Sequence, residues 1–200
     1  MDGNMTTMAS LRDWVVEAMR QNRFAEAEKA LRGALDAPAQ STDLRFLLGT
    51  VLAASGKLDE AIQYLEEIRK VAPDNVSLLN NLGNVLRLRG RAAEAVTHLR
   101  HALTIQPDSP DALINLGLSL LMLGRADQAV QCGRLALRLR AQNPEALSML
   151  ASALSEEGRY EEATHCFEQV LNLRPRDPAA LNGFASRSKD RFSSRCRPRR

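Results

Sequence analysis

Apolar residues recur along most of this chain at the i, i+3, i+4, i+7 spacing of an amphipathic helix. The run from Leu79 to Leu86 shows this spacing, and the same run returns from Leu113 to Leu120. A hydrophobic pattern that repeats at a fixed period of about 20–50 residues is typical of a protein built from stacked supersecondary units. The chain is therefore predicted to be all-α, with each unit containing two helices.

A glycine lies inside the first predicted helix of several units. Gly49, Gly83 and Gly117 each follow a leucine, and Ala151 takes the same place in the next copy. A glycine in a helix interior costs about 1 kcal/mol relative to alanine. Its recurrence predicts that a neighbouring helix approaches closely at this point.

A second glycine is predicted to end the first helix of each unit. A basic residue always follows it, and the first unit has Asn22-Arg23 at this place. Glycine, and next to it asparagine, takes the left-handed conformation that stops a helix. The glycines are Gly56, Gly90, Gly124 and Gly158.

The second helix of each unit is predicted from an acidic opening turn and an inner apolar face. In one unit this face contains Ala61, Leu65 and Ile68. Acidic residues suit the positive end of the helix dipole.

The whole chain is therefore predicted to contain an N-terminal segment that is disordered, five units, the start of a broken sixth unit or capping helix, and a disordered basic tail. The ranges are 1–7, then 8–41, 42–75, 76–109, 110–143 and 144–177, then 178–185 and 186–200.

This combination of positions resembles the tetratricopeptide repeat (TPR) family, over residues 8–177 and without insertions. The resemblance implies a right-handed superhelical solenoid whose inner surface is lined by the first helix of each unit. Two units depart from the pattern. Trp14 and Val15 replace the leucine-glycine pair in the first, as in a capping repeat. Gly133 replaces a large residue in the fourth, where we expect a thinner core.

The inner surface of the third unit is predicted to be polar. Asn80, Asn81, Asn84 and Arg87 lie on the side of the helix away from the leucines, and Asn115 repeats Asn81 in the next unit. An asparagine amide both donates and accepts hydrogen bonds, which suits the backbone of an extended peptide. The pair Asn81 and Asn115 is similar to the asparagine ladder in the repeat domain of O-GlcNAc transferases. A solvated polar helix face is the alternative interpretation.

The same surface turns apolar in the fourth unit, where Ile114, Leu118, Leu121 and Met122 join Asn115. A helix that is apolar nearly all round is expected to be covered on both sides. We therefore predict an interaction site here for a partner peptide or helix, a second copy, or the chain's own tail. The basic positions that chaperone-binding members of the family use to hold a C-terminal carboxylate are not filled.

Charge is concentrated at the end of the chain. The net charge is +3, but residues 186–200 alone hold seven bases and one acid, which leaves −3 for the rest. This tail has one large apolar side chain, Phe192, so we predict disorder. Binding of nucleic acid or of an acidic partner through the tail is an alternative function.

The sequence contains no motif typical of an enzyme active site, so a catalytic role, a cofactor and a metal are not predicted. His98, Cys132 and Cys166 share one repeat position, but residues on successive stacked helices lie about 8–10 Å apart. Metal ligands must lie about 2.0–2.3 Å from one ion, which disfavours a zinc site. No secretory signal or membrane span is recognised, and a cytoplasmic location is expected.

These observations predict a non-catalytic scaffold or adaptor that binds a peptide or helix of another protein in its concave groove. Two alternatives stay open beside it. One is a truncated regulatory repeat array of a larger, transferase-like enzyme, which the broken sixth unit suggests. The other is binding of nucleic acid or an acidic partner through the basic tail.

Overall fold

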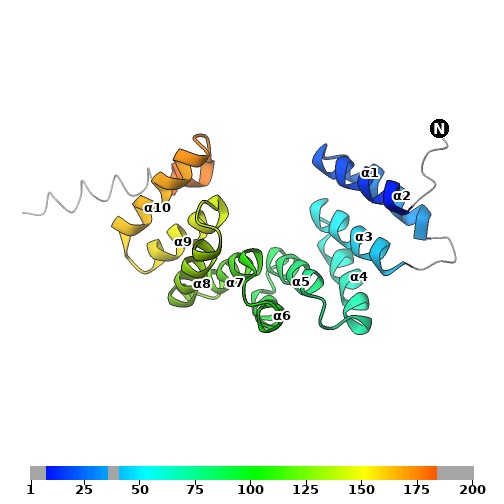
Figure 1. Cartoon of the computed structure of the whole chain (residues 1–200), viewed down its shortest axis with the longest axis horizontal. Helices are drawn as coiled ribbons and strands as arrows, with labels where there is room; N and C mark the ends of the chain where they lie inside the picture. The colour runs from blue at the N-terminus through cyan, green and yellow to red at the C-terminus, as the bar shows by residue number, and fades with distance from the viewer. Residues whose placement is uncertain (1–7, 36–40, 184–200) are drawn as a thin grey trace, which may run out of the picture. The chain divides into compact units, whose positions relative to one another are not determined.

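The computed structural model describes residues 8–35 and 41–183, and the helices in these ranges fold back on one another in consecutive pairs (Figure 1). Residues 178–183 are helical as well. The chain divides into two compact units, residues 1–102 and 103–200, and the division falls inside α6. The helices are α1 (Met8–Arg20), α2 (Phe24–Leu35), α3 (Thr42–Ala54), α4 (Leu58–Val71), α5 (Val76–Leu88), α6 (Ala92–Ile105), α7 (Pro110–Met122), α8 (Ala126–Leu139), α9 (Pro144–Glu156) and α10 (Tyr160–Leu173).

The first helices of the second to fifth repeats begin at a constant spacing along the chain, each after a side chain that caps it. The Asn75 Oδ1 accepts from the Leu78 N–H at 3.0 Å, and the Asn143 Oδ1 accepts from the Ala146 N–H at 3.0 Å. These bonds satisfy N–H groups that have no partner within the helix. The sequence prediction did not use this signal, although a serine, asparagine or aspartate recurs at the same repeat position. The capping residues are Ser41, Asn75, Ser109, Asn143 and Asp177.

The predicted helix stops are confirmed by the backbone. Gly90 has a φ of 87°, and Asn22, at the equivalent place in the first repeat, has a φ of 57°. After α5, the Arg91 N–H donates to the Leu86 carbonyl at 2.8 Å, and the Gly90 N–H donates to the Arg87 carbonyl at 2.9 Å. This pair of bonds is the Schellman arrangement that ends a helix at a left-handed residue. It turns the chain directly into the next helix.

The close helix approach predicted at the first-helix glycines is also present. In the first compact unit, a Cβ added at Gly83 would lie 2.5 Å from the Leu99 Cγ on α6. Both residues are buried, and Leu99 has no exposed surface. The absence of a side chain at Gly83 therefore lets α5 and α6 pack at this point. Gly49 has the same relation to Leu65, at 3.0 Å from the Cδ2.

The predicted thin core around Gly133 is wrong. A Cβ added at Gly133 would lie 2.9 Å from the Leu150 Cβ and 3.3 Å from the Met149 Cε, so the space is occupied. The Met149 thioether also lies against Gly117, whose added Cβ would be 2.5 Å from the sulfur. Met149 is 1% exposed, and its flexible side chain fills the space between these two glycines.

Ion pairs between charged side chains link neighbouring repeats within the first compact unit. The Lys57 Nζ and the Arg32 guanidinium each lie 3.0 Å from the Glu28 carboxylate. Burial raises the pKa of the Glu28 carboxyl, but these hydrogen bonds more than offset it and hold the pKa below its ordinary value. The Arg89 Nε lies 2.6 Å from the Asp59 carboxylate in the same way. Ion pairs at the surface contribute little to stability.

Several sequence predictions fall outside the described residues. The disorder expected for residues 1–7 and for the basic tail 186–200 concerns residues that the structure does not describe. The same holds for Phe184 and Ala185, which would continue the broken sixth unit. Within the described part, the Asp177 Oδ1 caps the helical residues that follow it, accepting from the Ala180 N–H at 2.9 Å.

Replacing Gly83 is expected to destabilise the protein, whereas replacing Gly33 in α2 is not. Gly83→Ala places a methyl group against the fully buried Leu99 and should lower the free energy of unfolding by about 1–3 kcal/mol. Gly33 has no atom within 4 Å of an added Cβ. Gly33→Ala should therefore raise stability by about 0.5–1 kcal/mol through helix propensity. Urea denaturation followed by circular dichroism compares the two midpoints, and equal shifts would contradict the packing described here.

Candidate functional site

The polar side of α5 forms the first part of the candidate site. Asn80, Asn81, Asn84 and Arg87 are all partly exposed, while Gly83 between them is buried. Their spacing places them on the side of α5 opposite the core leucines. The Arg87 Nη2 donates to the Asn84 Oδ1 at 2.8 Å, so the amide and the guanidinium form one polar cluster on this helix. We call this surface the α5 face.

Arg87 is the most unusual residue of the α5 face. Burial lowers the pKa of its guanidinium, and the Nε is buried without a hydrogen-bond partner among the described residues. Arg89, two residues further on, differs because its Nε lies 2.6 Å from the Asp59 carboxylate. Half-buried guanidinium groups are costly unless an acceptor satisfies them.

The structure corrects the prediction that Ile114 lies on an open apolar surface. Ile114 is 7% exposed and forms a buried cluster with Leu113 of the same helix, Ala136 of α8 and Ala146 of α9. The two alanines are small enough to let the isoleucine side chain enter the core. This side of α7 is therefore covered largely by its own neighbours, and no partner is needed to cover Ile114.

The remaining apolar residues of α7 differ in their exposure. Leu118 is partly buried and packs against the same cluster, and Leu121 is also partly buried. Met122 and the following Leu123 are 52% and 38% exposed. Asn115 is partly exposed, as expected. The part of α7 that can reach a ligand is therefore its C-terminal turn, together with one edge of Leu118.

A hollow of about 370 Å³ lies along α9 in the second compact unit. Four α9 residues line it, and each occupies the position of an α5 residue two repeats earlier: Ser148, Ser152, Ser155 and Glu156 correspond to Asn80, Asn84, Arg87 and Leu88. Phe167, Ala179, Asn182 and Gly183 complete the lining. The sequence prediction did not include this part of the surface.

The serines of this hollow are only partly satisfied. The Ser152 Oγ donates to the Ser148 carbonyl at 3.0 Å. The Ser155 Oγ is buried and has no hydrogen-bond partner among the described residues. Ser155 and the aromatic residue Phe167 both line the hollow.

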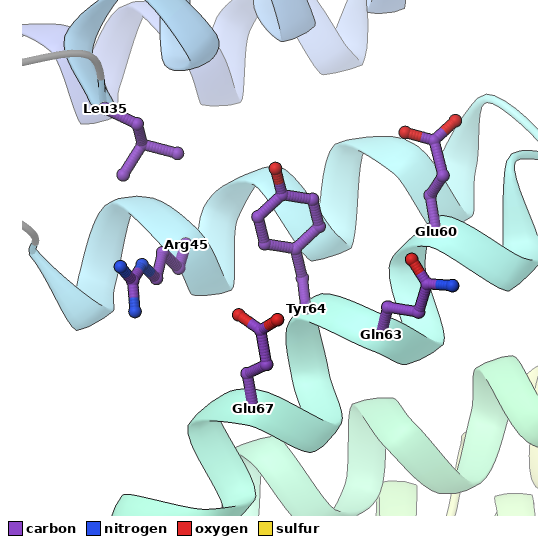
Figure 2. A pocket seen from close by; sticks show the side chains of 6 residues that line it. All are labelled: Leu35, Arg45, Glu60, Gln63, Tyr64 and Glu67. Carbon is purple, nitrogen blue, oxygen red and sulfur yellow. The ribbon is translucent and has the colours of Figure 1, made fainter.

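A second hollow, of about 460 Å³, lies in the first compact unit and uses residues outside the predicted site (Figure 2). Leu35 of α2 and Arg45 of α3 line it together with four residues of α4. Its carboxylate Glu60 already pairs with Arg32 at 2.6 Å. The hollow is therefore polar, and the charge of one of its carboxylates is neutralised by an ion pair within the protein. The α4 residues are Glu60, Gln63, Tyr64 and Glu67.

The shared repeat position of His98, Cys132 and Cys166 does not produce a metal site in the described residues. Groups of three or more histidine, cysteine or acidic side chains suited to an ion are not found in that part of the chain. Cys132 and Cys166 are both buried free thiols. Burial raises the pKa of the Cys166 thiol, which disfavours the reactive thiolate.

Comparison with known proteins places the chain in a family. The sequence profile of the tetratricopeptide repeat matches residues 37–108 and 74–142, and a second tetratricopeptide repeat profile matches residues 144–177. The chain therefore belongs to the tetratricopeptide repeat family, and its all-α fold of helix pairs is the fold of that family. No curated protein matches the sequence significantly.

Solved structures of similar proteins support this assignment. MamA AMB-1 is 28% identical with a TM-score of 0.67, and the alignment covers 82% of this chain and 96% of that one. MamA MSR-1 is 27% identical with a TM-score of 0.65, covering 84% and 97%. A tetratricopeptide repeat protein from Parabacteroides merdae ATCC 43184, 22% identical with a TM-score of 0.71 and covering 90% and 71%, shares the fold.

The family and its fold support a general role as a protein-interaction scaffold, and tetratricopeptide repeat proteins are typically non-catalytic. None of the helices in the described ranges combines the length and the apolar character needed to cross a bilayer.

Aspartate substitutions along α7 should separate core from surface. Met122→Asp is expected to change the free energy of unfolding by less than about 0.5 kcal/mol, because the side chain is half exposed. Ile114→Asp and Leu120→Asp should each cost several kcal/mol, because both bury an unpaired carboxylate. Leu118→Asp should fall between them. Urea denaturation of the four variants gives the order, and a strong loss for Met122→Asp would contradict the exposure described here.

Lowering the pH should destabilise the first compact unit through His98. Burial lowers the pKa of His98 below 6.5, and the Glu66 carboxylate at 3.7 Å opposes this shift only in part. Below about pH 6.5 the unfolded chain therefore binds more protons than the folded one, so stability falls as the pH drops. His98→Gln should reduce the loss of stability between pH 7 and pH 5.5.

Urea midpoints at the two pH values measure this effect. His165→Gln, an exposed histidine of the second compact unit, is the matched control and should leave the difference unchanged. Equal pH dependence in the wild type and in His98→Gln would contradict the assignment to His98.

Proposed function

We propose that this protein is a non-catalytic scaffold that binds a peptide or helix of a partner protein along the outward sides of its first helices. The proposal concerns the α5 face, the C-terminal turn of α7 and the hollow along α9. These surfaces belong to two compact units, and each supports the proposal by itself.

The hollow along α9 is the observation that carries the proposal. Three of its lining residues, Ser148, Ser152 and Ser155, occupy the repeat positions of Asn80, Asn84 and Arg87, which were predicted as a binding surface in the third unit. Recessed surfaces with a few polar groups are the usual form of a recognition site. The positions were selected from the helical period alone, so the hollow supports them independently.

Each compact unit offers its own chemistry to a ligand. On the α5 face of the first unit, the amides of Asn81 and Asn84 are suited to the N–H and carbonyl groups of an extended backbone. In the second unit, Met122 at the end of α7 offers a flexible apolar contact for a side chain. Both surfaces suit a peptide or helix as the ligand.

The exposed side of α8 is the competing surface. Leu135 is 39% exposed and lines a hollow of about 680 Å³ with Leu137 and three polar residues of the same helix. Leu135→Asp therefore replaces an exposed apolar side chain by a carboxylate, as Met122→Asp does, but on a different surface. The polar residues are Gln131, Arg134 and Arg138.

Substitutions on the two surfaces should separate them. Purified wild type, the double variant Asn81→Ala/Asn84→Ala, Met122→Asp and the control Leu135→Asp are used to capture proteins from a lysate of the source organism. The captured protein is identified by mass spectrometry, and its purified form is titrated against each variant by calorimetry. The first-helix variants should weaken binding at least tenfold, which corresponds to about 1.4 kcal/mol, and Leu135→Asp should not.

Binding that survives the first-helix variants and is lost with Leu135→Asp would place the interaction on α8 and contradict the proposal. Circular dichroism spectra and urea midpoints confirm that each variant is folded.

A further inference from the structure

Arg87 differs from three other arginines of the first compact unit. Arg32, Arg89 and Arg91 each lie 2.6–2.7 Å from a carboxylate oxygen. Arg87 instead donates to an amide, the Asn84 Oδ1 at 2.8 Å, and among the described residues no carboxylate lies within ion-pair distance of it. The protein therefore places a guanidinium on the α5 face without a counter-charge of its own.

The surroundings of Arg87 make this arrangement costly. Among the described residues, the Nε is buried without a hydrogen-bond partner, and burial lowers the pKa of the group. A buried N–H donor without an acceptor is unfavourable. The side chain as a whole is partly exposed, so a negatively charged ligand that accepts from the exposed part of the guanidinium would offset this cost.

The same repeat position is unsatisfied again in the second compact unit. Ser155 occupies the position of Arg87 two repeats further along the chain, and its Oγ is also buried without a partner among the described residues. The third unpaired atom of this kind, the Nε of Arg23, belongs to a side chain that lies 5.8 Å from the Trp14 ring and pairs with Glu26 at 3.3 Å. Arg87 and Ser155 therefore share one repeat position, and each has a buried polar atom without a hydrogen-bond partner among the described residues.

Resting on the function proposed above, we propose that the partner segment carries an acidic side chain whose carboxylate pairs with Arg87. The planar guanidinium matches a carboxylate with two parallel hydrogen bonds. The neighbours of Arg87 on the α5 face are the uncharged amides Asn80, Asn81 and Asn84 rather than further bases. A peptide with one acidic side chain, whose neighbouring backbone meets the amides, therefore fits this surface. Nucleic acid binding instead uses several basic side chains that contact phosphates.

Peptides selected on the intact chain test this proposal. A random dodecapeptide phage library is selected against the full-length protein, and the tightest peptides are synthesised with each acid in turn replaced by its amide, Glu by Gln or Asp by Asn. Their affinities are measured against the wild type, Arg87→Met, Arg87→Lys and the control Arg89→Met. Arg89 has the same charge but already pairs with Asp59.

One acid in the selected peptides should matter, and only when Arg87 is present. Its replacement by the amide should weaken binding to the wild type and to Arg89→Met about tenfold, in the range of a charged hydrogen bond. The same replacement should have no effect on binding to Arg87→Met, and an intermediate effect with Arg87→Lys. This double-mutant cycle isolates the pair from other changes.

The outcomes distinguish this inference from the function on which it rests. Peptides that bind the wild type without needing any acid, or whose acid still matters in Arg87→Met, would overturn the carboxylate pair and leave the scaffold function standing. A selection that yields no peptide sensitive to Asn81→Ala/Asn84→Ala would overturn the carboxylate pair and also remove the α5 face from the proposed function. If Arg87→Met does not fold, the loss measured with Arg87→Lys decides, because that variant keeps the charge but not the paired geometry.

Discussion

The contact between a first-helix glycine and a buried side chain of a neighbouring helix determines how this chain is arranged. At Gly83 the α5 backbone lies directly against Leu99, so this side of the helix is fixed to the core. The residues immediately beside and one turn beyond it, Asn84 and Arg87, are then held on the other side. Which side chains can meet a ligand is therefore decided by where a side chain is missing. In this repeat, the packing of α5 and the exposure of its polar side therefore depend on the same residue, Gly83.

The repeat fold was predictable because its determinants are local. A helix stop at Gly90 or Asn22 follows from the backbone conformation that these residue types adopt. The spacing of the leucines follows from the helical period. The exposure of a site residue was predictable only where it depends on the residue's own helix, as for Asn84. Ile114 was assigned to the surface because a helical wheel treats α7 by itself, whereas the small Ala136 and Ala146 on two other helices admit its side chain. Such information lies in the contacts between helices.

Recognition and structure occupy separate positions in this repeat. The core leucines and the turn glycines hardly change from one copy to the next, but the outward position of Asn84 becomes Leu118 in the next repeat and Ser152 in the one after. The α5 face is polar, the end of α7 apolar and the α9 hollow lined by hydroxyls. A repeat of this kind can therefore present different chemistry at its outward position, although Leu118 shows that a side chain at this position can also pack against the core.

Met149 and Gly133 link two positions that the repeat pattern treats as independent. The methionine of one repeat fills the place that a large residue of the preceding repeat would occupy, and it lies against Gly117 as well. Each of these residues is therefore viable only in the company of the others. A single change at Gly133 or at Met149 therefore leaves an overfilled or an empty core at the junction of the fourth and fifth repeats. The same holds for exchanging either repeat for an ordinary one, because the packing unit here is the pair of repeats.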